Sequence, residues 1–416
     1  MERGRRLDLA WSEEAPHLPP RERGWVHEAV YGTVRLRGRL DYLLGLHLRK
    51  GLGSLPPDLA PVLRLASYQI LNMGGTPAYA AVSQAVDQTR ALAHGRLARV
   101  VNGVLRSLAR EGGGVSRFPG LESDPVEHLT HWGSHPRWLV ERWIVSHGVE
   151  GAAGLVEASN RIPSTYLQPF TLSPERAVAV LEEAGIPAEL GPVATGSIRL
   201  GHGASPEAAL QAVPGIIQDP AAAAVVRWCG PVRGLGALDL CAAPGGKALA
   251  LAAAGARVTA ADLSLRRLAL VRDGARRTGF SVPLVQASAA APPFVPADFV
   301  LLDAPCSGTG TLARHPDGRW RLSESDISAL SRVQRSLIDG AAGAVRPGGL
   351  LVYSTCTLEP EENEEQVESF LGRHGDFIVE EGGESHADMV SGRLLQILPS
   401  ISPDRDGAFA ARLRRR

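Results

Sequence analysis

Apolar residues recur at helical spacing through the first quarter of the chain. Between residues 21 and 110 they stand three or four positions apart, which places them along one face of a helix. Leu59, Val62, Ala66 and Ile70 form one such face, and glycines 112–114 then end the last helix. We predict four or more helices here, packed as an all-α domain.

The pattern changes after residue 220 to short apolar strands that alternate with alanine-rich helices. Strands separated by helices are typical of βαβ units and of a mostly parallel sheet. Residues 126 to 215 are mixed in character, with helical signals at 136–145 and 174–184. We predict a helical domain over 1–115, a small α/β segment over 116–215 and an α/β domain over 216–416. The predicted strands of the last domain are 237–240, 257–261, 283–286, 298–303 and 349–354.

Composition describes a soluble, multidomain chain. Its 416 residues are 44% hydrophobic and 21% charged, enough to bury a large core in two or three domains. The longest apolar stretches are too short to span a membrane, and the first residues are charged. The four cysteines, at 229, 241, 306 and 356, include no Cys-x-x-Cys pair, which argues against a zinc site or a disulfide framework. We expect a cytoplasmic protein with reduced thiols and no metal.

Charge is distributed unevenly along the chain. The net charge is zero, but residues 1–111 hold 16 Lys and Arg against 10 Asp and Glu. That excess favours the helical domain as the part that binds a polyanion. Among the 44 basic residues only Lys50 and Lys247 are lysines. A compact primary amine therefore has a specific purpose at position 247.

A glycine-containing turn stands where an open α/β sheet binds a nucleotide. Residues 237–247 read ALDLCAAPGGK, which closes a strand and opens a helix. Asp262 closes the next strand, where an acid can accept hydrogen bonds from ribose hydroxyls. The turn fits S-adenosylmethionine or a dinucleotide, and a purely structural turn is the remaining alternative.

Two more strand ends carry a cysteine each. Residues 301–310 read LLDAPCSGTG and residues 351–357 read LVYSTCT. A single cysteine is more often a small buried apolar residue than a nucleophile. Cys306 and Cys356, however, follow successive strands at one edge of the sheet and stand among small polar residues. This arrangement favours a reactive pair.

These motifs resemble those of the RNA cytosine-5 methyltransferases. The DAPCS motif at 303–307, the YSTCT motif at 353–357 with PEENE at 360–364, and the DLCAAPGGK loop are similar to that family, most of all to its bacterial RsmB/Sun branch. VYGTV at 30–34 and VNGVLR at 101–106 resemble the NusB-like N-terminal domain of this branch. The resemblance implies a NusB-like all-α RNA-binding domain, a small RNA-binding subdomain and a Rossmann-like methyltransferase domain with a NOL1/NOP2/Sun catalytic core.

The resemblance also implies a covalent mechanism. Carbon 5 of cytosine is a poor nucleophile, so a thiolate must first add to carbon 6. By its motif Cys356 is that nucleophile and Cys306 assists release of the methylated base. Asp303 and Lys247 contact the base or the reaction centre, where a cation also stabilises developing negative charge.

Cofactor contacts follow from the same motifs, with S-adenosylmethionine as the cofactor. One position departs from the family pattern, because Ser288 stands where an aspartate near the adenine is usual. The implied cofactor residues are Cys241, Ala242, Ala243, Pro244, Gly245, Gly246, Lys247, Asp262, Arg267, Ser288 and Asp303.

The expected substrate is a cytosine in RNA, most of all in the small-subunit (16S) ribosomal RNA. The alternatives are the same chemistry on transfer RNA or another ribosomal site, and a non-catalytic NusB-like RNA-binding protein. A dinucleotide-dependent oxidoreductase is disfavoured, since the loop is AAPGGK and not Gly-x-Gly-x-x-Gly. No membrane and no obligate protein partner is expected, and a monomer is the default.

Overall fold

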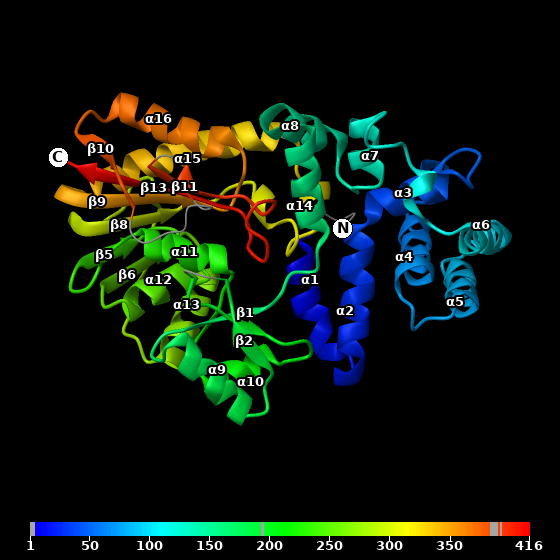
Figure 1. Ribbon diagram of the computed structural model, residues 1–416, viewed down its shortest axis with the longest axis horizontal. Coiled ribbons are helices and arrows are strands. Elements are labelled where there is room, and N and C mark those ends of the chain that lie inside the picture. The colour runs from blue at the N-terminus through cyan, green and yellow to red at the C-terminus, as the bar shows by residue number, and fades with distance from the viewer. Residues whose placement is uncertain (1–4, 193–194, 383–389, 392) are drawn as a thin grey trace. The chain divides into compact units, whose positions relative to one another are not determined.

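The computed structural model describes residues 5–192, 195–382, 390–391 and 393–416, which fall into two compact units (Figure 1). One unit comprises Met1–Arg161 together with Leu312–Leu322, and the other comprises Ile162–Thr311 together with Ser323–Arg416. The chain therefore leaves the second unit, enters the first for eleven residues, and returns.

The first unit is helical, as predicted. Its core joins Leu44, Leu63, Val82, Val101 and Leu105 from four successive helices. The last of these ends where Gly112 adopts a φ of +73°, a conformation that favours glycine. The helices are α1 (Leu7–Glu14), α2 (Pro20–Arg35), α3 (Arg37–Gly45), α4 (Leu59–Asn72), α5 (Ala78–Ala91), α6 (Ala98–Glu111), α7 (Pro125–His131), α8 (Arg137–Asn160) and the short α14 (Gly318–Arg321).

This unit continues past residue 115, the expected end of the first domain, because α7 and α8 pack on the preceding helices. Phe118 is buried against Leu43 and Leu108. Ahead of α8, the hydroxyl of Ser134 accepts a hydrogen bond from the Gly38 amide at 2.9 Å. The functional division at residue 115 stays a prediction, but the packing of the helical unit runs to residue 161.

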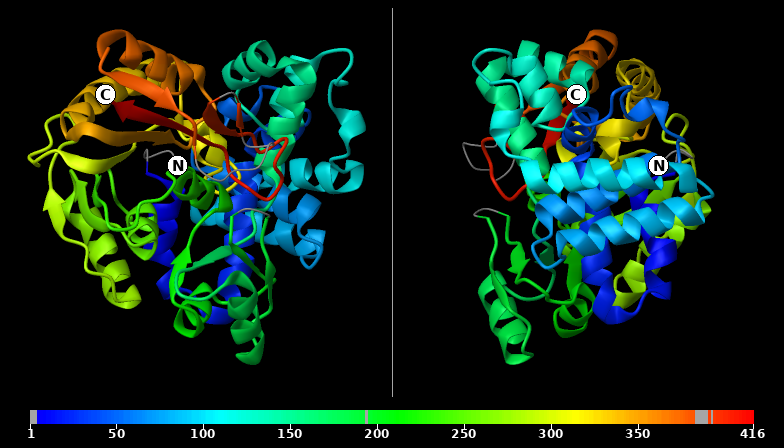
Figure 2. Two further views of the ribbon diagram at one scale, coloured as in Figure 1. Left: turned by 60° about the vertical axis from the view of Figure 1, so that its left-hand side comes forward. Right: turned by 90° about the vertical axis from the view of Figure 1, so that its right-hand side faces the viewer.

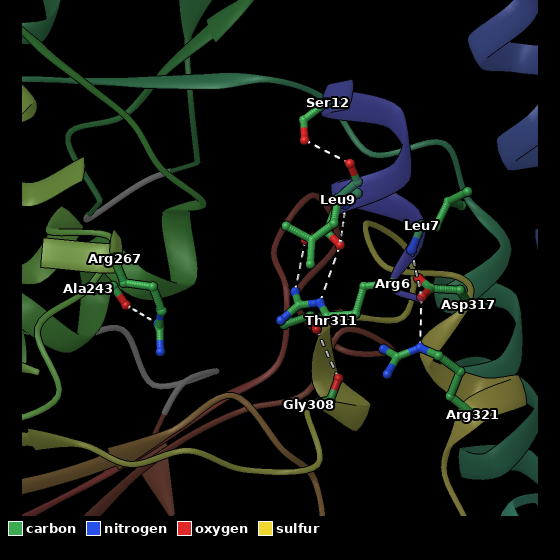
Figure 3. A network of polar contacts seen from close by, with 11 residues as sticks. Arg6, Leu7, Leu9, Ser12, Ala243, Arg267, Gly308, Thr311, Asp317 and Arg321 are labelled. Atoms are coloured by element: carbon green, nitrogen blue, oxygen red, sulfur yellow. Dashed lines mark hydrogen bonds and ion pairs between the residues drawn. The ribbon is translucent and has the colours of Figure 1, made fainter. Parts of the chain in front are cut away.

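The returning segment Leu312–Leu322 is held in the helical unit by a buried guanidinium. Arg319 is fully buried and donates to Asn160 Oδ1 at 2.7 Å and to the Ser159 carbonyl at 2.8 Å. In the same segment Asp317 accepts from the Leu7 amide at 3.1 Å and from Arg321 Nε at 2.8 Å (Figure 3). Its polar contacts thus lie with helices far away in the sequence.

The second unit begins with a small α/β element. Its sheet is antiparallel, with strand order β2-β3-β1-β4, and a core around Leu167, Leu181 and Ile198 joins it to two helices. This is the α/β character predicted before residue 215. The elements are β1 (Tyr166–Pro169), α9 (Pro174–Glu183), β2 (Ala188–Leu190), β3 (Ile198–Leu200), α10 (Pro206–Ala212) and β4 (Gly215–Ile217).

A large sheet forms the rest of this unit, with strand order β11-β12-β13-β9-β8-β5-β6-β7 and β10 paired to β13. The five predicted strands are present and mutually parallel, from β9 through β7. An antiparallel part, built from β10 to β13, was not predicted. The strands are β5 (Gly236–Asp239), β6 (Arg257–Asp262), β7 (Leu284–Gln286), β8 (Ala297–Asp303), β9 (Val345–Thr355), β10 (Phe377–Glu380), β11 (Val390–Ser391), β12 (Leu394–Ile397) and β13 (Ala408–Arg415).

Helices cover both faces of this sheet (Figures 1 and 2). Alternate residues of one strand point to opposite faces: Phe299 and Leu301 pack with α11 to α13, whereas Val300 and Leu302 pack with α15 and α16. Such two-sided burial explains why the parallel strands read as continuous apolar runs. The helices are α11 (Pro220–Trp228), α12 (Gly246–Ala253), α13 (Leu265–Thr278), α15 (Glu324–Gly343) and α16 (Glu364–Arg373).

Among the residues that the structure describes, no helix is long and apolar enough to cross a membrane.

Candidate active site

The predicted site residues meet at the carboxyl edge of the parallel strands. From β5 the chain runs outward to β6 and β7 on one side, and β8 and β9 lie on the other. The connections after β5 and β8 therefore diverge, and ligands of open α/β sheets bind at such a switch point, which we call the crevice here.

The turn after β5 is shaped by two glycines. Gly245 has a φ of +111°, and a Cβ there would lie 3.1 Å from the Cα of Val271 in α13. A Cβ on Gly246 would lie 2.9 Å from Nε2 of Gln218. The turn therefore fits closely against its neighbours, and α12 begins at Gly246 with its amide groups directed at the crevice edge.

Asp262 and Arg267 hold this turn from the neighbouring strand. The carboxylate of Asp262 accepts from the Ala243 amide at 3.3 Å and from the Ser264 amide at 3.0 Å. Arg267 lies 3.6 Å from Asp262 and donates to the Ala243 carbonyl (Figure 3). Arg267 is thus more than a solvated helix residue, because it ties α13 to the predicted cofactor loop.

Asp239 is a buried acid within the ALDLCAAPGGK motif. It was not among the predicted site residues. Only 1% of it is exposed, and neither carboxylate oxygen makes a hydrogen bond of normal geometry within the described residues. Burial, reinforced by the charge of Asp303, raises the pKa of Asp239 to about 8. A buried acid with neither oxygen in a normal hydrogen bond at the cofactor turn suits a positively charged ligand.

The residues present therefore fit S-adenosylmethionine. Its sulfonium and ammonium groups carry positive charge, and the crevice gathers the carboxylates of Asp239, Asp262 and Asp303 around one lysine. Such a surplus of acid favours a cationic ligand over the pyrophosphate of a dinucleotide.

Lys247 and Asp303 form an ion pair at the centre of the crevice. Lys247 Nζ donates to Asp303 Oδ2 at 2.7 Å, and the Ser354 hydroxyl donates to Asp303 Oδ1 at 2.8 Å. Burial opposes the charge on Lys247, but the attraction of Asp303 outweighs it and raises the lysine pKa. The amine is thus held as a cation at this edge of the sheet.

The two predicted cysteines lie side by side. Cys306 Sγ is 3.4 Å from Cys356 Sγ, and both thiols are free. The hydrogen bond to Cys356, together with burial, raises the pKa of Cys306 well above its usual value. Cys306 therefore holds its proton more tightly than an ordinary cysteine.

The remaining predicted residues lie around the turn. Burial raises the pKa of Cys241 to about 12, so this thiol is unreactive, and the same holds for the buried Cys229. Ala242 and Ala243 are buried and Pro244 is exposed. Ser288 caps a local turn, where its hydroxyl accepts from the Ala290 amide at 3.2 Å.

Comparison with known proteins decides the family. A model described as 16S rRNA methyltransferase RsmB/F matches residues 228–414, a NusB family model matches 2–110, and a ferredoxin-like domain model of the RsmF/B methyltransferases matches 135–205. The chain is 33% identical to a probable ribosomal RNA small subunit methyltransferase B of Bacillus subtilis, over 96% of this chain and 92% of that protein. The chain belongs to the RsmB/F family of methyltransferases.

Further relatives agree with this assignment. The small subunit methyltransferase B of Klebsiella pneumoniae is 30% identical over 100% of this chain and 95% of its own length. The solved structure of PH0851 superposes with a TM-score of 0.77 at 25% identity, over 95% of this chain and 90% of that one. The predicted family and the predicted fold are confirmed. The chain is an S-adenosylmethionine-dependent methyltransferase with a NusB-like helical domain.

Sequence reasoning missed a set of buried polar residues behind the cysteines. Glu362 accepts from the Ser307 amide at 2.9 Å and from the Ser307 hydroxyl. Gln334 Nε2 donates to Glu362 Oε1 at 2.8 Å. Thr357 and Thr309 continue this network, with 2.7 Å between the Ser307 and Thr357 hydroxyls. The PEENE motif was a signal for Glu362, but nothing in the sequence indicated its partner.

Proposed function

We propose that this RsmB/F-family protein methylates carbon 5 of a cytosine in 16S ribosomal RNA through a covalent adduct with Cys356. The observation that supports this most is the pair of sulfurs 3.4 Å apart beside the Lys247–Asp303 ion pair. One thiol can add to the base and the other can remove a proton from the same ring.

The first step is addition of the Cys356 thiolate to carbon 6. The bond from Cys356 Sγ to carbon 6 forms as the carbon 5–carbon 6 double bond opens, which pushes electron density toward carbon 5 and the polar edge of the ring. We assign the Lys247–Asp303 pair to this edge of the base, so that the cationic amine stabilises the added charge. S-adenosylmethionine, when bound, supplies the electrophilic methyl group that carbon 5 accepts.

The second step is release, in which Cys306 acts as a base. After methyl transfer carbon 5 bears both the methyl group and its original proton. Cys356 is then a neutral thioether, so the anion whose hydrogen bond and charge raised the pKa of Cys306 is gone. Cys306 loses its proton to solvent, takes the proton of carbon 5, and the double bond re-forms as Cys356 leaves as a thiolate.

The cofactor is held by the turn after β5 and by the acids around it. Asp262, Arg267 and the backbone of residues 241–247 would hold its nucleoside and amino-acid parts, and Ser288 would be a further contact for the adenosyl group. Asp239 adds a carboxylate for its positive charge.

The helical domain is the part proposed to bind RNA. Its surplus of basic residues favours contact with phosphates. The target cytosine must be unpaired or flipped out before a thiolate can reach carbon 6. We place this reaction in the cytoplasm, with the chain acting as a monomer.

Bisulfite sequencing of RNA from cells with and without the gene tests the substrate, because 5-methylcytosine resists the conversion that cytosine undergoes. We expect one protected position in 16S ribosomal RNA to be lost in the deletion strain. Loss at a transfer RNA position would keep the chemistry and refute the substrate. No loss in any RNA would refute both.

Substitution of each cysteine tests the mechanism. Cys356→Ala removes the nucleophile, so turnover should fall by ~10⁴-fold or more. Cys306→Ala should still form the adduct but release it slowly, so a protein–RNA band should persist on denaturing gels. Normal turnover of Cys306→Ala, or no adduct from it, would contradict the release step.

A further inference from the structure

Two side chains, Gln334 and Glu362, form hydrogen bonds to the backbone on both sides of Cys306. Gln334 Nε2 donates to the carbonyl of Pro305 at 2.9 Å, directly before the cysteine. Glu362 Oε1 accepts from the amide of Ser307 at 2.9 Å, directly after it. Gln334 and Glu362 are also bonded to each other at 2.8 Å. The peptide that carries Cys306 is thus clamped from one side of the loop by two joined side chains.

This clamp also fixes the Cys306 loop to the Cys356 loop. The Ser307 hydroxyl lies 2.7 Å from the Thr357 hydroxyl, in the residue after Cys356. Tyr353, in the strand that leads to Cys356, donates from its hydroxyl to the Glu362 carbonyl at 2.6 Å. Glu362 therefore makes contact with both loops, one through its side chain and one through its backbone.

The centre of the clamp is buried. Gln334 and Glu362 are both 0% exposed, so solvent does not readily replace the hydrogen bond between them when a substitution removes it. Burial raises the pKa of Glu362, while the bonds from Ser307 and Gln334 oppose that rise. A buried acid is costly, and Glu362 touches neither sulfur in the contacts described, so its use lies in holding the loop.

We propose that Glu362 is a positioning residue for product release, which holds Cys306 against Cys356 through Ser307 and Gln334. This inference rests on the proposed release role of Cys306. Without the carboxylate, the Ser307 amide and the Gln334 amide lose a shared acceptor, and the Cys306 loop is free to shift relative to the adduct. Addition by Cys356 is retained, because β9 and its own loop carry that residue.

The experiment measures adduct lifetime and methyl transfer separately, with the full-length protein, S-adenosylmethionine and a 16S ribosomal RNA fragment. For Glu362→Ala we expect the single-turnover rate of methyl transfer to change by less than ~3-fold and steady-state turnover to fall by ~10–100-fold, with adduct accumulation. Glu362→Gln keeps one oxygen for both amide donors and should recover much of the release rate. Glu365→Ala, an exposed acid three residues on, is the matched control and should behave as wild type.

Smaller variants keep the test decisive if Glu362→Ala does not fold. Ser307→Ala removes the two hydroxyl bonds, to Thr357 and to Glu362, and Gln334→Ala removes the bonds to Pro305 and to Glu362. Each should lengthen the adduct lifetime, and normal adduct lifetimes in both, or in folded Glu362→Ala, would overturn the proposal. The Cys306→Ala protein separates this outcome from failure of the mechanism: if it traps no adduct, the release role itself is wrong.

Discussion

The two halves of the crevice are built differently. Behind the cysteines, Ser307, Thr357 and Glu362 are bonded to one another across two loops. On the cofactor half, Asp239 is buried with neither oxygen in a normal hydrogen bond, within the part of the chain described here. In one half the buried carboxylate is satisfied by neighbours within the protein, whereas the other half holds a buried carboxylate whose oxygens can accept from a ligand.

This difference matches the two kinds of work required. A thiolate that adds to a ring and a thiol that later removes a proton must be held in fixed relative positions, which rigid hydrogen bonds provide. A cofactor that enters and leaves in every cycle requires a site whose interactions form on binding. Lys247 lies between the two halves. It is paired with Asp303, and the charge of Cys356 also helps to raise the pKa of the lysine.

The largest expected effect comes from removing the cation shared by the two halves. Lys247→Met should lower kcat by ~10³-fold or more, because the added negative charge on the ring and the acid cluster both lose their counter-charge. The control is Lys50→Met, which removes the exposed lysine of the helical unit proposed to bind RNA and should leave kcat at saturating RNA unchanged. A Lys247→Met enzyme with more than a tenth of normal activity would show that the halves do not depend on this amine.

A smaller effect is expected at the unsatisfied acid. Asp239→Asn should weaken binding of S-adenosylmethionine by ~10–100-fold in calorimetry, since an amide cannot offset positive charge. Asp273→Asn on the exposed face of α13 is the matched control. Equal affinity in Asp239→Asn and wild type would mean that the cofactor half is satisfied without this carboxylate.

The same acid predicts a pH dependence of stability. Its pKa is raised from 3.8 to about 8, so the folded, ligand-free protein holds this proton more tightly than the unfolded chain does. The contribution of Asp239 to stability therefore falls as pH rises from 3.8 to about 8. Asp239→Asn should exceed wild type in unfolding free energy at pH 8, by on the order of 5 kcal/mol at most, and the gap should shrink toward pH 4. A gap that is constant with pH would contradict the burial argument.

A further variant tests the shape of the cofactor turn. Gly245→Ala forces a side chain into a φ of +111° with its Cβ 3.1 Å from the Val271 backbone. It should lower the free energy of unfolding by ~2–4 kcal/mol in chemical denaturation. Gly343→Ala, where a Cβ meets no atom within 4 Å, should be neutral or slightly stabilising. An equal loss of unfolding free energy in both variants would show that the turn does not specifically require glycine at position 245.

The smallest expected effect is at Ser288, which departs from the family pattern. Ser288→Asp supplies a carboxylate that can still accept from the Ala290 amide, the bond that the serine makes at 3.2 Å. Cofactor affinity should tighten by ~2–10-fold if that oxygen reaches the adenosyl group. Unchanged or weaker affinity for S-adenosylmethionine would show that the serine at position 288 does not weaken cofactor binding.

The sequence by itself determined the parallel strands, the helical N-terminal unit, the family and the strand ends that carry Lys247, Cys306 and Cys356. It could do so because apolar periodicity reports which face of an element is buried and because the motifs are local. The antiparallel strands from Phe377 onward were not predicted. β10 to β12 are short, and β13 pairs with the Cys356 strand, an arrangement that the tertiary structure selects.

Only the tertiary structure decided which side chains meet. The two sulfurs are separated by 50 residues in sequence, Ser307 and Glu362 by 55, and Arg319 and Asn160 by 159. Hydrogen bonds require contact within about 3 Å, and no periodicity within one element specifies a partner on another. For the same reason the packing of Leu312–Leu322 into the helical unit, and the clamp around Cys306, became visible only when the folded chain brought these segments together.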